Sequence, residues 1–132
     1  MTHSEETPVA TDWPRHSLSE IEDRLCAEGG RFEMELRDVA GIETRTWKQA
    51  LPDMAALVRH SAGHGERSFI VYEDERMSYR GFARATARLA AHLGALGIGP
   101  GDRVALAMRN LPEWPVCYFA AAAIGAIVVP LN

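Results

Sequence analysis

Two histidines four residues apart are the first side chains in this sequence that suggest chemistry. His60 and His64 have the spacing that places two imidazoles on one face of a helix, as in zinc sites with the pattern HExxH. Here Ser61 follows the first histidine, and Gly63 and Gly65 are expected to end the helix. We therefore expect both histidines to be exposed to solvent rather than bound to a metal.

The cysteines and the remaining internal histidine offer no nucleophile. Cys26 and Cys117 lie far apart, and neither has a neighbouring histidine that would activate its thiol. Cys117 falls on an apolar helix face, where a cysteine is usually a small buried side chain. His92 lies within a long predicted helix, where we expect an exposed or core-edge position. We expect no catalytic role for any of the three.

A cationic helix face and an aromatic cluster each allow two interpretations. The arginines would bind an anion or form a solvated face, and the aromatic cluster would line an apolar ligand channel or pack in the core. We favour the solvated face and the core, and we assign no catalytic, cofactor-binding or metal-binding residue. The arginines are Arg80, Arg84 and Arg88, and the cluster is Trp114, Pro115, Tyr118 and Phe119.

The stretch from Gly94 to Gly101 contains four glycines and resembles a phosphate-binding loop in composition only. Phosphate loops follow a strand and open a helix, so that backbone N–H groups meet the phosphate. Here a helix ends and a strand begins. The pattern therefore predicts a helix-to-strand turn, with Asp102 and Arg103 anchoring it through hydrogen bonds and charge.

Composition limits the chain to a small, acidic protein. It has 132 residues, 14 basic and 18 acidic side chains, and a formal net charge of −4. One domain at most fits this length. The chain lacks the basic excess of nucleic-acid-binding proteins, so we expect no nucleic-acid partner. Two cysteines without a CxxC pattern and no secretory leader favour the cytoplasm. The acidic charge is concentrated in residues 1–66, which we interpret as a solvated face.

The first half predicts a helix, a hairpin and a second helix. Residues 1–16 read as a mobile leader, and Ser17 with Glu20 forms a capping box for a helix that stops at the Gly29–Gly30 pair. Alternating polarity over 32–37 predicts a half-buried strand, which a turn at 39–41 pairs with a second strand over 42–47. Pro52 precedes a helix that closes near Gly63.

The second half predicts a hairpin followed by a parallel βαβ unit, and hence an α/β fold. Strands are expected at 68–72 and 76–78, and Ser78 caps a long helix that ends before Gly97. The apolar runs 104–108 and 126–129 suit strands covered on both faces. Asn110 and Glu113 form a cap-like pair for the helix between them. Residues 114–131 carry no charge, but Pro115, Gly125 and Pro130 divide them into a helix and a strand, so we expect no transmembrane segment.

The order of motifs from residue 66 onward resembles the start of the AMP-forming adenylate ligases, the superfamily of acyl-CoA synthetases and luciferases. Residues 17–52 also resemble the N-terminal extension of bacterial fatty-acyl-CoA ligases, less specifically. One departure is Gly81, which stands where the family has an acidic residue three positions after the cap, leaving the capping box incomplete. The matching motifs are Ser78-Tyr79, Leu96-Gly97, Gly101-Asp102-Arg103-Val104, Asn110-x-Pro112-Glu113-Trp114, Gly125-Ala126 and Val129-Pro130-Leu131-Asn132.

This resemblance implies a parent enzyme that uses ATP, Mg and CoA to convert a carboxylic acid into an acyl-CoA. The likeness to fatty-acyl-CoA ligases implies that this acid is a fatty acid. The family's Ser/Thr/Gly-rich phosphate loop, its later acidic residues and its C-terminal catalytic lysine have no counterpart here. Lys48, the one lysine, lies in the wrong context to replace the last of these. We therefore expect an inactive scaffold: residues 17–65 as an N-terminal extension and 66–132 as the truncated start of the ligase domain.

The last predicted strand also suggests that the fold is incomplete. Residues 127–129 are apolar on both faces, so the strand requires neighbours and helical cover, and an exposed edge would promote self-association. Two alternatives remain open. One is a stand-alone interaction module that docks through this edge, and the other is the start of an adenylation domain that loads a carrier protein.

Overall fold

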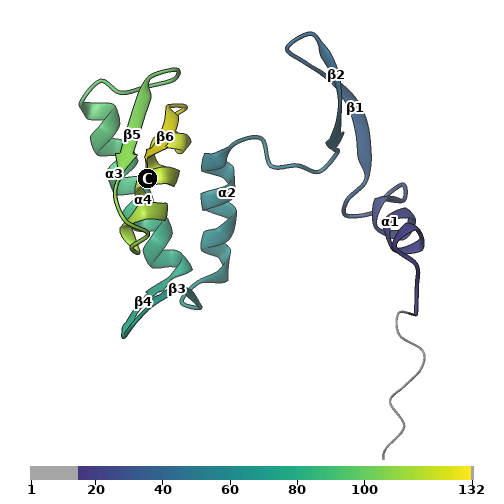
Figure 1. Ribbon diagram of the computed structural model, residues 1–132, viewed down its shortest axis with the longest axis horizontal. Coiled ribbons are helices and arrows are strands. Elements are labelled where there is room, and N and C mark those ends of the chain that lie inside the picture. The colour runs from purple at the N-terminus through teal and green to yellow at the C-terminus, as the bar shows by residue number, and fades with distance from the viewer. Residues whose placement is uncertain (1–14, 132) are drawn as a thin grey trace, which may run out of the picture. The chain divides into compact units, whose positions relative to one another are not determined.

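The computed structural model describes residues 15–131, which form two compact units (Figure 1). The first unit ends at Ala50 and the second begins at Leu51. The leader expected over residues 1–16 lies outside the described residues except for its last two positions. The expected division of the chain between residues 65 and 66 stays a prediction.

The first helix, α1 (Leu18–Cys26), begins at the predicted capping box. The Ser17 hydroxyl oxygen accepts a hydrogen bond from the backbone N–H of Glu20 at 3.2 Å, and the Glu20 carboxylate accepts one from the backbone N–H of Ser17 at 2.7 Å. The helix stops at Cys26, before the predicted glycine pair, because Ala27 is already extended. Its apolar stripe of Leu18, Ile21 and Leu25 is exposed.

Strands β1 (Met34–Val39) and β2 (Ile42–Trp47) form the predicted antiparallel hairpin. Its turn residues, Ala40 and Gly41, both have positive φ, 55° and 85°. This geometry matches the twist of a two-residue hairpin. The Asp38 carboxylate also accepts a hydrogen bond from the backbone N–H of Gly41 at 2.9 Å.

The prediction that this hairpin is half-buried is wrong for most of its length. Leu36 is 61% exposed and Ile42 is 68% exposed, although their positions suit a buried face. Among the described residues the two strands form a sheet of their own, and a two-stranded ribbon without a second layer leaves both faces open to solvent. Alternation of polarity therefore identified the strands but not their environment.

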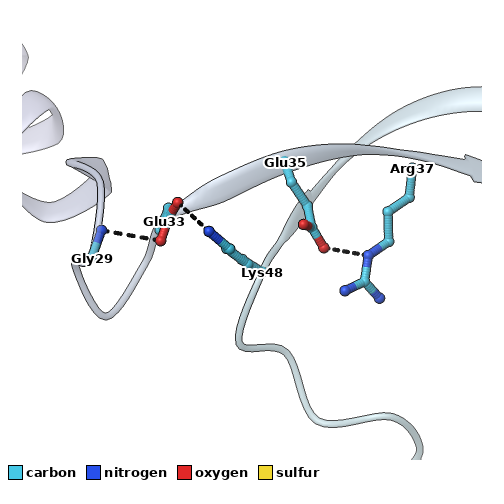
Figure 2. A network of polar contacts seen from close by, with 5 residues as sticks. All are labelled: Gly29, Glu33, Glu35, Arg37 and Lys48. Carbon is cyan, nitrogen blue, oxygen red and sulfur yellow. Dashed lines mark hydrogen bonds and ion pairs between the residues drawn. The ribbon is translucent and has the colours of Figure 1, made fainter.

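Glu33 connects the loop after α1 to the end of the hairpin (Figure 2). Its carboxylate accepts hydrogen bonds from the Lys48 ammonium at 2.7 Å and from the backbone N–H of Gly29 at 3.1 Å. These two bonds hold the pKa of Glu33 below its ordinary value, and the bond from Lys48 has the larger effect. The same bond raises the pKa of Lys48. A separate ion pair joins Glu35 and Arg37.

The second unit begins with α2 (Met54–Ser61) and a short 3-10 helix, η1 (Ala62–His64). Asp53, directly after Pro52, is the N-cap, and its carboxylate accepts a hydrogen bond from the backbone N–H of Ala56 at 2.6 Å. Strands β3 (Ser68–Tyr72) and β4 (Glu75–Ser78) then form the second predicted hairpin.

Ser78 connects this hairpin to α3 (Tyr79–Ala95) as the predicted N-cap. Its hydroxyl accepts a hydrogen bond from the backbone N–H of Gly81 at 3.1 Å and donates one to the Glu66 carboxylate at 2.9 Å. Although position 81 has no acidic side chain, the bond from its backbone N–H to the Ser78 hydroxyl, which is one of the two bonds of a capping box, is present. The backbone N–H of Tyr79 also donates to the carbonyl of Arg67, across the base of the hairpin.

The core of this unit lies where α3 packs on α4 (Glu113–Ala123). Phe82 is 2% exposed, and its ring contacts those of Phe69 and Phe119 with centroids 4.7 and 5.7 Å apart. Ala120 and Ala121 on α4 are fully buried. Leu96 lies just beyond the end of α3 and is exposed, because the chain turns at Gly97.

Strands β5 (Arg103–Ala107) and β6 (Ile127–Leu131) are parallel and connected by α4, as the βαβ prediction requires (Figure 1). The prediction that both strands are covered on two faces is not met in the described residues. Leu106 is buried, but Ile127, Val129 and Leu131 are exposed. The cause is that, within residues 15–131, β5 and β6 form a two-stranded sheet and the helix packed against it is α4.

The start of α4 differs from the predicted cap. Pro112, not Asn110, occupies the N-cap position, and no side chain caps the helix. The backbone N–H of Trp114 instead donates to the carbonyl of Leu111 at 2.9 Å. A tight backbone turn therefore replaces the expected side-chain cap.

A close backbone approach fixes the amino ends of β5 and β6. Gly125, at φ 81°, lies so near Pro100 that a Cβ would be 3.2 Å from three of the proline's atoms. The backbone N–H of Gly101 donates to the Gly125 carbonyl at 3.0 Å, and that of Ile127 donates to the Asp102 carbonyl at 2.7 Å. These contacts set the register in which Arg103 pairs with Ile127.

We expect Gly125→Ala to destabilise the second unit, because alanine would be strained at positive φ and would contact Pro100. The strain alone costs about 1–2 kcal/mol. Urea unfolding followed by circular dichroism measures the change. Gly94→Ala is the matched control, since nothing lies near its Cβ, and helix propensity predicts a gain of about 0.5–1 kcal/mol. Equal behaviour of the two variants would contradict the close approach.

We expect Thr86→Val to stabilise the protein by about 1 kcal/mol, because an unsatisfied buried hydroxyl is replaced by a methyl group. Thr86 is 1% exposed, and its hydroxyl has no hydrogen-bond partner among the described residues. Thr86→Ser, which keeps the hydroxyl and removes the methyl group, should destabilise. A loss of stability in the valine variant, measured by thermal unfolding, would show that the hydroxyl is satisfied.

The Glu33 network predicts a pH dependence of the first unit. The pKa of Glu33 is lower in the folded state than in the unfolded state. Its contribution to folding stability is therefore complete above the unfolded pKa of about 4.3 and is lost as the pH falls through the folded pKa. In an NMR titration of its carboxyl carbon, Lys48→Gln should move the midpoint upward. Arg45→Gln removes the same charge from the hairpin and should leave the midpoint in place. A midpoint unchanged by Lys48→Gln would refute the pairing.

Candidate hydrophobic hollow at the carboxyl ends of β5 and β6

A hollow lies at the carboxyl ends of the two parallel strands. This is the edge at which open α/β sheets commonly bind ligands. The loop from β5 to α4 supplies most of its lining, and the end of β3 supplies one aromatic residue. Its volume is about 670 Å³, and it is lined by Tyr72, Ala107, Met108, Arg109, Asn110, Leu111 and Leu131.

The polar groups in this hollow can bind a ligand but cannot readily transfer a proton. Arg109 and Asn110 are exposed, and Tyr72 is half-buried. A guanidinium is a permanent cation with donors suited to a carboxylate or phosphate, and an amide offers both donors and acceptors. The lining contains no histidine, cysteine or carboxylate. The hollow thus has binding character without an acid–base or nucleophilic pair.

The histidine pair is exposed, as expected, and is split between two helices. His60 lies in the last turn of α2, whereas His64 lies in η1, where its ring packs against Tyr79 with centroids 4.7 Å apart. Between residues 15 and 131, no three histidine, cysteine or acidic side chains gather in a way that could hold a metal ion. His92 is exposed on α3.

The glycine-rich segment forms the predicted helix-to-strand turn. Gly97 has φ 87° directly after α3, and the Asp102 carboxylate accepts a hydrogen bond from the backbone N–H of Gly99 at 2.8 Å. The carboxyl end of α3 presents carbonyl groups, whose partial negative charge disfavours phosphate. Asp102 therefore anchors the turn, and the turn does not form a phosphate loop.

The arginines of α3 are exposed, and Arg80 pairs with Glu66 at 3.3 Å. The aromatic cluster is divided between two environments. The Phe119 ring packs edge-on against buried Phe82, as the core interpretation predicts. Trp114 stacks on Tyr118 with centroids 5.3 Å apart and lines a second hollow of about 320 Å³ with Pro115. Both cysteines are free and half-buried.

Sequence reasoning did not single out Tyr72, Met108 and Arg109 as neighbours. The usable signal was the position of the segment from Met108 to Leu111, which directly follows the carboxyl end of a predicted parallel strand. Tyr72 carried no such signal, because its approach depends on how β3 packs relative to β5. Among the described residues, no helix has the length and apolar character needed to cross a membrane.

Comparison with known proteins gives a consistent family. Residues 57–132 match the model of the AMP-binding enzyme family. The medium/long-chain-fatty-acid–CoA ligase FadD6 of Mycobacterium tuberculosis is 42% identical over 73 residues. That match covers 54% of this chain but only 12% of the relative, so the chain corresponds to a small part of that ligase's length.

Solved structures support the same fold. The N-terminal domain of FACL13 from Mycobacterium tuberculosis, bound to an inhibitor, is 35% identical, with a TM-score of 0.56, over 62% of this chain and 21% of that one. NpsA-ThdA of Klebsiella oxytoca, an artificially fused adenylation–PCP di-domain, is 25% identical, with a TM-score of 0.61. The match covers 66% of this chain and 17% of that one.

The family model covers more than half of the chain, and the observed hairpin, long helix and βαβ unit lie within the matched region. This chain belongs to the AMP-binding enzyme family.

Proposed function

We propose that the whole protein is an AMP-forming acyl-CoA ligase, with a fatty acid as its carboxylic acid substrate. The observation that carries this proposal is the 42% identity to a fatty-acid–CoA ligase over 73 residues, 54% of this chain. The identity to FACL13 across a similar share of the chain supports it.

The proposed reaction has two steps. The carboxylate oxygen attacks the α-phosphorus of ATP, forming an acyl-adenylate and releasing pyrophosphate. The thiol sulfur of CoA then attacks the acyl carbon, the thiol proton is lost, and AMP leaves with the electron pair of the cleaved bond. This two-step reaction needs groups that hold the phosphates and a metal ion while negative charge develops in the transition state.

The described residues do not fit ATP or Mg, so no step is assigned to them. The glycine-rich turn follows the carboxyl end of a helix, and α4 begins without a side-chain cap or a glycine-rich approach. No three potential metal-ligating side chains gather in residues 15–131. The hollow contains one cation, Arg109, which matches a single anionic group at most.

We propose that this chain contributes scaffold to the ligase. The α3–α4 packing and the Pro100–Gly125 approach fix two parallel strands whose carboxyl ends border the hollow. The Tyr72 ring and the apolar side chains there are suited to support an acyl or aromatic group bound mainly by other parts of the protein.

The free cysteines favour a cytoplasmic location for the whole protein.

A second candidate is an adenylation domain that loads a carrier protein. The similarity to NpsA-ThdA, an artificially fused adenylation–PCP di-domain, favours it. Both candidates share formation of the acyl-adenylate, and they differ only in the thiol that accepts the acyl group.

We expect the 132-residue chain alone to bind ATP with Mg no more tightly than about 1 mM, equivalent to about −4 kcal/mol. The physical reason is that Arg109 alone cannot neutralise a triphosphate. Isothermal titration calorimetry is the measurement. Saturable micromolar binding would overturn the scaffold role. If it occurred, loss of binding in Arg109→Gln but not in the matched surface variant Arg88→Gln would locate the nucleotide in the hollow.

The gene region that follows codon 132 provides the test of the whole-protein proposal. We expect an open reading frame that encodes a Ser/Thr/Gly-rich loop ending in Pro-Lys-Gly. The protein expressed from that frame should release pyrophosphate with a fatty acid and ATP, and should form a thioester with CoA. Thioester formation on a carrier protein but not on CoA would favour the second candidate. A stop codon after Asn132 would refute both.

A further inference from the structure

We draw no further inference here: the strongest candidate, the alanine-lined groove between α2, α3 and α4 beside the unpartnered hydroxyl of Thr86, is an apolar helical face for which nothing in the structure shows what covers it.

Discussion

The packing of α3 on α4 is the contact on which the second unit depends. Ala120 and Ala121 on α4 are fully buried, and the Phe82 ring on α3 contacts the rings of Phe69 on β3 and Phe119 on α4. Contacting aromatic rings bury a large apolar area in a closely packed interior. Short loops connect the two ends of α4 to β5 and β6, so the helix contact also bears on where the sheet lies.

Two features at opposite ends of β5 and β6 follow from this arrangement. At the amino ends, Gly125 lies against Pro100 and fixes the strand register. At the carboxyl ends, the loop containing Arg109 and Asn110 opens into the hollow. The first end is closely packed and the second is open, a division that α/β proteins use to separate stability from binding. We propose a scaffold role for this chain because the lining of the open end carries no acid–base or nucleophilic pair.

Most helices and strands could be predicted from local sequence signals. The predictions that failed concerned features that depend on tertiary packing. The caps at Ser17 and Ser78 and the turns at Gly41 and Gly97 each depend on a few adjacent residues, so the sequence was sufficient to place them. Exposure of Leu36 and Ile127 depends on whether a second layer is present, and periodicity carries no information about that. The start of α4 was predicted wrongly, because no side chain caps this helix and the backbone N–H of Trp114 donates to the carbonyl of Leu111. The candidate site was hardest to predict, because Tyr72 and Arg109 meet only through tertiary contacts.

The bond from Ser78 to Glu66 also bears on the order of folding. Together with the bond from Tyr79 to Arg67, it closes the β3–β4 hairpin across a short stretch of chain and joins it to the first turn of α3. Closing a short loop costs little entropy, whereas pairing β5 with β6 requires the whole of α4 to form between them. On loop-closure entropy we therefore expect the hairpin and the start of α3 to form early, and the parallel strands that border the hollow to pair later.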